Sequence, residues 1–153
     1  MSKKLPGEDL ELILAEYDSL LLGDVYDIAV KQEERGNSGL ALKIYEYAVK
    51  RFKVSCNDTT YERYMGAVMY TALGKLYFFK EEYDTAEVAL YKAGELNAGN
   101  LEAFYWEAEI CAAKGFIDNA KTLFRLVLEK SNNSTLIAQT QRRLNDFEKK
   151  VIN

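Results

Sequence analysis

Residues 67–100 read AVMYTALGKLYFFKEEYDTAEVALYKAGELNAGN, and this stretch decides the fold. Its first half alternates small and aromatic residues around Gly74, and its second half sets Ala86 among apolar residues at helical spacing. The later stretch GFIDNAKTLFRLVLEKSNN (115–133) has the same pattern, with Ala120 standing 34 residues after Ala86. The chain therefore contains an internal repeat, and each copy is predicted to be a pair of helices.

A third copy of the pattern occurs earlier, in residues 24–52, where Ala41 stands in the place of Ala86. These two alanines are 45 residues apart, 11 more than one repeat, and the excess falls within FKVSCNDTTYE (53–63). That segment contains turn-forming Asn and Asp, so it is either a helix extension or a loop. The equivalent positions are Val25, Tyr70 and Phe104; Ile28, Leu73 and Glu107; Ala29, Gly74 and Ala108; Ala41, Ala86 and Ala120; Tyr45, Leu90 and Phe124; Ala48, Ala93 and Val127.

The 34-residue period, with its spaced aromatics and alanines, resembles the tetratricopeptide (TPR) family. In residues 67–100 the likeness is carried by Tyr70, Gly74 and Tyr77 among others, and it fails at the final proline, where Ala98 stands. One TPR repeat cannot bury its apolar face alone, so neighbouring repeats stack. The resemblance implies an all-α fold, a TPR-type α-solenoid of three helix-turn-helix repeats with N-terminal and C-terminal capping helices.

We predict a single domain over residues 1–153. Its N-terminal helix is amphipathic and is either a second cap or a dimerisation or docking surface. At the other end, Ser134 or Thr135 is the expected N-cap of the last helix. The residues of the N-terminal surface are Leu10, Ile13, Leu14 and Tyr17. The expected segments are the N-terminal helix (8–21), repeat 1 (22–52), an insertion (53–66), repeat 2 (67–100), repeat 3 (101–133) and a C-terminal capping helix (134–152).

The composition is that of a globular protein, with 48% hydrophobic and 29% charged residues and a net charge of −4. This acidic balance argues against nucleic acid as a partner. No run approaches the roughly 20 apolar residues of a membrane span. The N-terminal MSKKLPGEDLE has no apolar core of the kind found in signal peptides, so we expect a cytoplasmic protein without stable membrane insertion.

Few residues in the sequence suit catalysis or metal binding. Histidine, the commonest general base and metal ligand, is absent. Cys56 and Cys111 lie 55 residues apart without metal-ligand spacing, and we expect two reduced thiols. We therefore predict that the protein is not an enzyme, that it has no catalytic or metal-binding residues, and that it takes no cofactor.

In the TPR geometry the first helix of each repeat lines a concave groove, which here would be apolar and aromatic with few charges. Phe78 and Phe79 fall about 100° and 200° further round the helix than Tyr77, so they cannot share its burial. Such exposed aromatics suit a groove that binds an extended peptide, although each could instead pack against flanking helices. The predicted peptide-binding residues are Tyr26, Val30, Val68, Thr71, Lys75, Phe78, Phe79, Tyr105 and Glu109.

Two blocks, VYDIAVKQEERGNSGLALKIYEYAV (25–49) and FYWEAEICAAKGFIDNAKTLFRLVLE (104–129), resemble the first and third repeats of class II chaperones of bacterial type III secretion. The resemblance implies a chaperone in the bacterial cytoplasm. It would hold an extended apolar segment of a secreted translocator, or another secretion-apparatus protein, in its groove before export. It also implies a possible homodimer. The alternatives are a TPR scaffold in an assembly unrelated to secretion and a regulatory enzyme subunit.

Overall fold

The computed structural model describes residues 22–54 and 60–152. These residues form seven α-helices and contain no strand, which confirms the expected all-α class. The N-terminal segment 8–21, with Leu10, Ile13, Leu14 and Tyr17, lies outside the described residues. The helices are α2 (Leu22–Glu34), α3 (Ser38–Val54), α4 (Thr60–Phe79), α5 (Tyr83–Leu96), α6 (Leu101–Ala113), α7 (Ile117–Lys130) and α8 (Ser134–Ile152).

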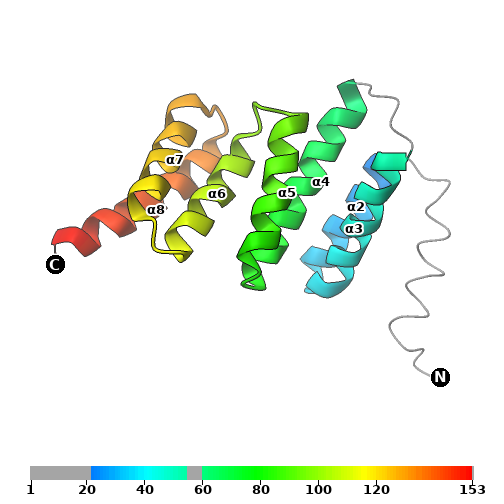
Figure 1. Ribbon diagram of the computed structural model, residues 1–153, viewed down its shortest axis with the longest axis horizontal. Helices are drawn as coiled ribbons and strands as arrows, with labels where there is room; N and C mark the ends of the chain where they lie inside the picture. The colour runs from blue at the N-terminus through cyan, green and yellow to red at the C-terminus, as the bar shows by residue number, and fades with distance from the viewer. Residues whose placement is uncertain (1–21, 55–59, 153) are drawn as a thin grey trace, which may run out of the picture.

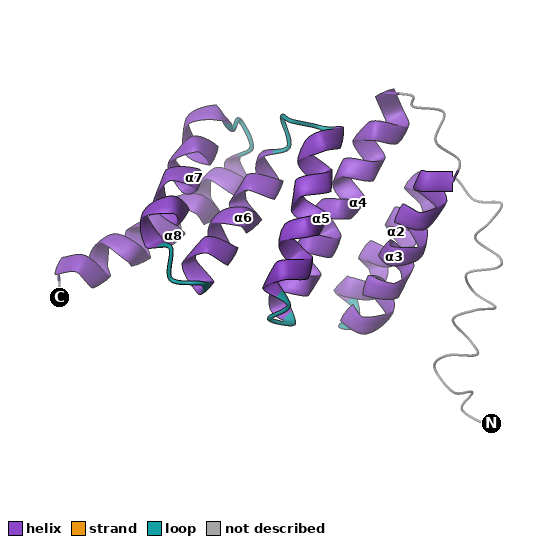
Figure 2. Ribbon diagram, in the orientation of Figure 1, coloured by secondary structure: helices purple, strands orange, loops and turns teal. Residues whose placement is uncertain are grey.

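The helices form a row of antiparallel pairs, each pair stacked on the next (Figures 1 and 2). The most extensive packing is within the pairs α2–α3, α4–α5 and α6–α7. Consecutive pairs touch through α3 and α4 and through α5 and α6, and α8 packs on α7 at the end of the row. The first helices of successive pairs also touch, α2 with α4 and α4 with α6, so one face of the row is built from these three helices.

The core follows the sequence repeat in the second helix of each pair. All nine side chains at the three repeated positions of α3, α5 and α7 are at most 1% exposed. In each helix a buried small residue is followed one turn later by a larger buried one, so the same pattern is used three times. These positions are Ala41, Ala86 and Ala120; Tyr45, Leu90 and Phe124; Ala48, Ala93 and Val127.

The turns inside the three pairs share one conformation, with a single residue at positive φ. Gly36, Glu81 and Gly115 have φ values of 82°, 61° and 89°. In each turn the backbone N–H of the next residue donates to the carbonyl five residues earlier, as Glu82 does to Tyr77 at 3.0 Å. This is the Schellman ending of a helix, which usually has glycine at the left-handed position. Glu81 occupies it without glycine, so the middle turn carries some backbone strain.

The extra residues between the first and second pairs mostly lengthen helices. The helix α3 continues to Val54, and α4 already begins at Thr60, before the repeat pattern resumes at residue 67. Residues 55–59 between them lie outside the described part of the chain.

The N-cap of α8 differs from the expected one. The side chain of Asn133, not that of Ser134 or Thr135, accepts the backbone N–H groups of Thr135 and Leu136, at 3.0 and 3.1 Å. Asparagine caps as well as serine does, because its short side chain carries an acceptor at the right distance. The helix then buries Leu144 and Phe147 against the last pair.

The contact between α4 and α5 gives a test of this packing. A Cβ at Gly74 would lie 2.6 Å from the Cγ of Leu90, which is fully buried. We expect Gly74→Ala to lower the free energy of unfolding by about 1–3 kcal/mol, because the two helices must separate or Leu90 must leave its rotamer. The measurement is urea unfolding followed by circular dichroism.

Gly94→Ala is the matched control, since a Cβ at Gly94 would have no atom within 4 Å. It should raise stability by up to about 1 kcal/mol through helix propensity alone. Equal stability of the Gly74→Ala variant and the wild type would contradict close packing of α4 on α5.

Candidate functional site

A groove of about 730 Å³ crosses the face built from α2, α4 and α6 and ends at α8; we call it the central groove. Its apolar lining comes from Val30, Val68, Ala72, Leu101 and Leu136. The rest of its wall is largely polar, with tyrosines, carboxylates, hydroxyls and side-chain amides. The polar and glycine lining consists of Tyr26, Glu33, Glu34, Tyr45, Tyr64, Thr71, Lys75, Asn97, Gly99, Asn100, Glu102, Ser131, Asn132, Asn133, Thr135 and Gln139.

One carboxylate links three helices at the α2 end of the central groove. Glu33 of α2 accepts a hydrogen bond from the hydroxyl of Tyr45 of α3 at 2.6 Å. Its second oxygen lies 2.8 Å from Nζ of Lys75 of α4. Burial, and next the hydrogen bond to Glu33, raises the pKa of Tyr45 above its ordinary value. The network therefore fixes α2 and α3 against α4 along the wall of the groove.

An asparagine joins the second and third pairs in the middle of the groove. The side chain of Asn100 accepts the backbone N–H of Ala103, which caps α6, and its Nδ2 donates to Oγ1 of Thr71 at 2.7 Å. The Thr71 hydroxyl in turn donates to the carbonyl of Ala67 at 2.8 Å. Thr71 lines the groove, but it is only 3% exposed, and its hydroxyl group is already used in these two hydrogen bonds.

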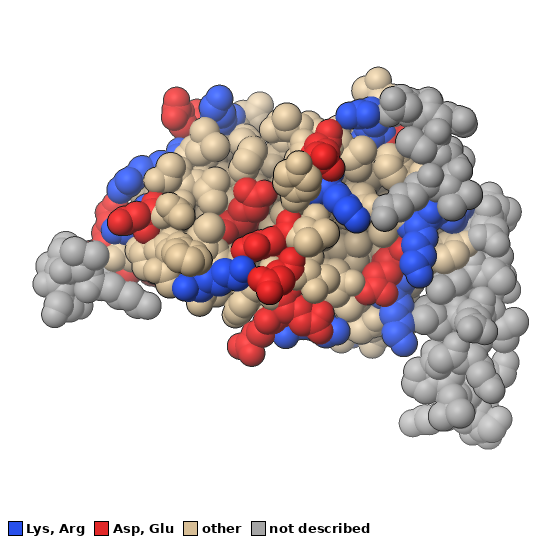
Figure 3. Space-filling view, viewed as in Figure 1, with Lys and Arg blue, Asp and Glu red and all other residues tan. Residues whose placement is uncertain are grey.

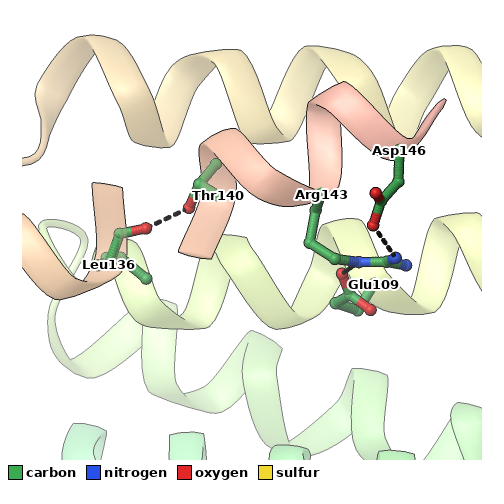
Figure 4. A network of polar contacts seen from close by, with 5 residues as sticks. All are labelled: Glu109, Leu136, Thr140, Arg143 and Asp146. Atoms are coloured by element: carbon green, nitrogen blue, oxygen red, sulfur yellow. Dashed lines mark hydrogen bonds and ion pairs between the residues drawn. The ribbon is translucent and has the colours of Figure 1, made fainter. Parts of the chain in front are cut away.

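A smaller pocket of about 380 Å³ lies between α4, α6 and α8, and we call it the end pocket. Its polar side chains are Glu109 and Arg143, whose Nε lies 2.6 Å from the Glu109 carboxylate (Figure 4). Arg143 also approaches Asp146 at 3.4 Å, so the guanidinium is held in place from two sides. The remaining lining is apolar: Phe78, Ala112, Ala113, Ile117 and Phe147.

Aromatic side chains cluster where α4 ends beside α6. The rings of Phe78 and Phe79 each lie with their centroids 5.5 Å from that of Trp106. Phe79 is nevertheless 65% exposed, whereas Trp106 is buried. Among the described side chains, the indole Nε1 of Trp106 is the buried polar atom that lacks a hydrogen-bond partner. A buried polar atom without a partner costs stability, so the position of the Trp106 indole is unfavourable for the isolated fold.

The structure brings most of the predicted binding residues to these two cavities. Tyr26, Val30, Val68, Thr71 and Lys75 line the central groove, and Phe78 and Glu109 line the end pocket. Phe79 lines neither cavity and projects beside Phe78, with ring centroids 5.4 Å apart.

Tyr105 is the predicted binding residue that the structure places inside the core. It is 3% exposed, and its ring packs between Trp106 and Phe124. Burial, and next the Glu109 charge, raises the pKa of Tyr105 to about 12. A ligand therefore cannot reach its ring in this conformation, and mutating it would disturb the core.

The polar wall was not predicted from the sequence. The predicted groove was confined to the first helices, whereas the two turns at 97–100 and 131–133 contribute much of the lining. The signal was present, since both turns are rich in asparagine and lie one 34-residue step apart. The acidic character of the groove was also not predicted: three carboxylates share its lining with the single ammonium of Lys75. The carboxylates belong to Glu33, Glu34 and Glu102.

The described ranges contain neither a candidate metal site nor a candidate membrane span. Residues 22–54 and 60–152 contain no group of three or more His, Cys, Asp or Glu side chains able to hold a metal ion. Within the same ranges no helix combines the length and apolar character needed to span a membrane.

Comparison with known proteins identified no family. No protein-family model matches the chain, and no curated protein matches it.

The ion pair between Arg143 and Glu109 should stabilise the fold as well as define the end pocket. Arg143→Met leaves the Glu109 carboxylate, whose side chain is only 10% exposed, without its cation. We expect a loss of about 1–3 kcal/mol, since an unpaired and mostly buried charge is costly. The double variant Arg143→Met with Glu109→Met should recover most of the loss in urea unfolding. Equal losses in the single and double variants would contradict a paired Glu109.

The buried tyrosine of the central groove should make stability fall at alkaline pH. Because the folded state holds the Tyr45 proton more tightly than the unfolded state, the free energy of unfolding decreases as pH rises above about 10. One such group contributes about 1.4 kcal/mol per pH unit. Tyr45→Phe should reduce this slope in urea unfolding between pH 9 and 11.5. The control Tyr91→Phe, at a ring that is 66% exposed, should keep the wild-type slope; an unchanged slope in Tyr45→Phe would contradict a protonated, buried phenol.

Proposed function

We propose that the protein is a TPR-type helical-repeat protein that binds an extended segment of another protein along the central groove. Support comes from the stacked helix pairs, the three turns of one kind and the nine buried positions at the repeat spacing. The observation that carries the proposal is the groove itself, one cavity whose lining comes from the first helices of all three pairs and from α8. Helical solenoids commonly bind their partners on such surfaces.

The polar wall favours recognition of a peptide backbone. Side-chain amides such as Asn97, Asn132 and Gln139 each carry both a donor and an acceptor, so one amide can pair with a backbone N–H and C=O. An extended segment exposes these groups along its whole length. The acidic residues of the wall would disfavour a strongly acidic segment.

The end pocket would seat an apolar side chain of the same segment. Phe78, Ile117 and Phe147 give it apolar walls, and the exposed ring of Phe79 extends the apolar surface beside it. Binding energy in protein complexes is concentrated in a few such anchors, while polar contacts set the register. We therefore propose one apolar anchor at the end pocket and backbone recognition along the central groove. This differs from the mainly apolar and aromatic groove that the sequence suggested.

We propose a secreted translocator as the partner, on the basis of the resemblance to class II chaperones of bacterial type III secretion. A translocator that inserts into membranes carries apolar segments that aggregate in water, and a groove of this kind would shield one of them before export. In this proposal the protein acts in the bacterial cytoplasm, without catalysis and without a cofactor. The resemblance also implies a homodimer through the N-terminal segment, which lies outside the described residues. A scaffold that holds an assembly together would use the same groove for a partner that is soluble by itself.

Two substitutions at exposed lining residues test the proposal without disturbing the core. Tyr64→Glu changes the central groove, and Ala113→Glu changes the end pocket. In pull-downs from the source cell, read by quantitative mass spectrometry, both should lower recovery of the main partner roughly tenfold, the effect of losing one good anchor. Phe116→Glu, at an exposed ring that lines neither cavity, is the matched control and should retain the partner.

Co-expression of the partner found in this way decides between the two roles. A secretion chaperone should make soluble a partner that is insoluble alone, whereas a scaffold's partner is soluble without it. Full recovery of the partner by both groove variants would overturn binding in the groove.

A further inference from the structure

A third cavity, of about 600 Å³, lies between α5 and α7 over the outward side of α6; we call it the outer groove. It is distinct from the proposed peptide site. Glu107 lines the outer groove and Glu109 lines the end pocket, and residues two apart point about 200° away from each other around a helix. The residues of the outer groove are Asp84, Glu87, Val88, Tyr91, Glu107, Cys111 and Leu123.

Glu107 is the unusual residue of this cavity. At the equivalent place in the second pair stands Leu73, which is 3% exposed and belongs to the core. Glu107 is also half-buried, yet within the described residues no hydrogen bond or ion pair reaches its carboxylate. Its electrostatic neighbour is another carboxylate, Glu87, and burial and this neighbour both raise the pKa of Glu107. A charge in this position destabilises the isolated fold, because it loses water without gaining a partner.

The other two carboxylates of the outer groove, Asp84 and Glu87, already share a lysine. Nζ of Lys114 lies 2.9 Å from the carboxylate of Asp84 and 2.8 Å from that of Glu87. One ammonium thus serves two carboxylates, and Glu107 remains without a cation. Acidic side chains gather over α5 and α6 in the middle of the face shown in Figure 3. The outer groove therefore has an excess of negative charge.

The rim of the outer groove is apolar and exposed. Val88 and Tyr91, one turn apart on α5, are 56% and 66% exposed. Leu123 of α7 lies across the groove and is half-buried. Large exposed apolar side chains grouped around a concave site are typical of protein interaction surfaces.

We propose that the outer groove docks a segment of a partner protein in which a lysine or arginine lies next to an apolar side chain. The cation would pair with Glu107 in the floor, and the apolar side chain would cover Val88, Tyr91 and Leu123. Charge complementarity selects this occupant, since the groove offers a carboxylate without a counter-charge beside an apolar rim. Pairing with a cation would supply the contact that the Glu107 carboxylate lacks in the isolated chain. This site is independent of the central groove, so the chain would bind two segments on opposite faces.

The test begins with a phage-displayed library of 12-residue peptides, selected on the full-length protein. Binding of the selected peptides is then measured by fluorescence anisotropy. We expect the selected peptides to contain an Arg or Lys next to an apolar residue. Glu107→Gln should lower their affinity about tenfold or more, because one charge-assisted hydrogen bond is lost. Citrulline keeps the shape of arginine without its charge. Replacing the selected arginine by citrulline should lower the affinity for the wild type by a similar factor and hardly change the affinity for Glu107→Gln.

Two further variants serve as controls. Glu129→Gln, at an exposed carboxylate of α7 outside the outer groove, should bind as the wild type does. Glu107→Leu, which introduces the residue of the second repeat, should raise the thermal midpoint while abolishing binding. This variant separates loss of docking from loss of folding.

The alternatives give different results. If the selected peptides lack basic residues, or bind Glu107→Gln as tightly as the wild type, the proposal fails. If sedimentation instead shows a dimer that Glu107→Gln dissociates, the groove is an interface between copies of this chain and the proposed occupant is wrong. Peptides that are lost only in Tyr64→Glu and Ala113→Glu belong to the central groove; if the selection returns only these, the outer groove does not dock peptides.

Discussion

The close contact of α4 with α5 is the constraint on which the rest of the structure depends. Gly74 presents no side chain to Leu90, so the two helices approach until the leucine fills the space between them. Ala29 and Ala108 take the same place in the other two pairs, where both are fully buried. With a small residue at this place in every pair, the two helices of each pair pack together, and the first helices of successive pairs touch. The central groove is a consequence of that stacking.

The repeating part of the fold could be predicted from the sequence because its cause is local. Small and larger apolar residues at helical spacing predict a helix with one buried face, and the same triplets recur from Ala41 to Val127. The exposure of Phe79 also followed from helix geometry alone. Such properties can be predicted from the angular positions of the residues around a single helix. The same argument was wrong for Phe78, which is half-buried like Tyr77 because Trp106 packs against its ring.

Features that depend on contacts between distant residues could not be predicted in this way. Tyr105 was expected in the groove, but Phe124 and Trp106 enclose its ring. Glu109 was expected as a binding residue, and its pairing with Arg143, 34 residues further along the chain, was not foreseen. The polar wall arises because turns that are remote in sequence meet over the first helices, which a helix-by-helix reading does not reveal.

The central claim is that a partner segment lies along the central groove and reaches the end pocket. Site-specific photocrosslinking tests it most directly, with benzoylphenylalanine placed at Tyr64, Ala113 or Phe116 of the protein in complex with its natural partner. All three positions are exposed, but only the first two line the cavities. Crosslinks from positions 64 and 113 to a single short stretch of the partner, with none from 116, are the predicted result. Crosslinks from 116 alone, or from 64 and 113 to unrelated stretches of the partner, would contradict it.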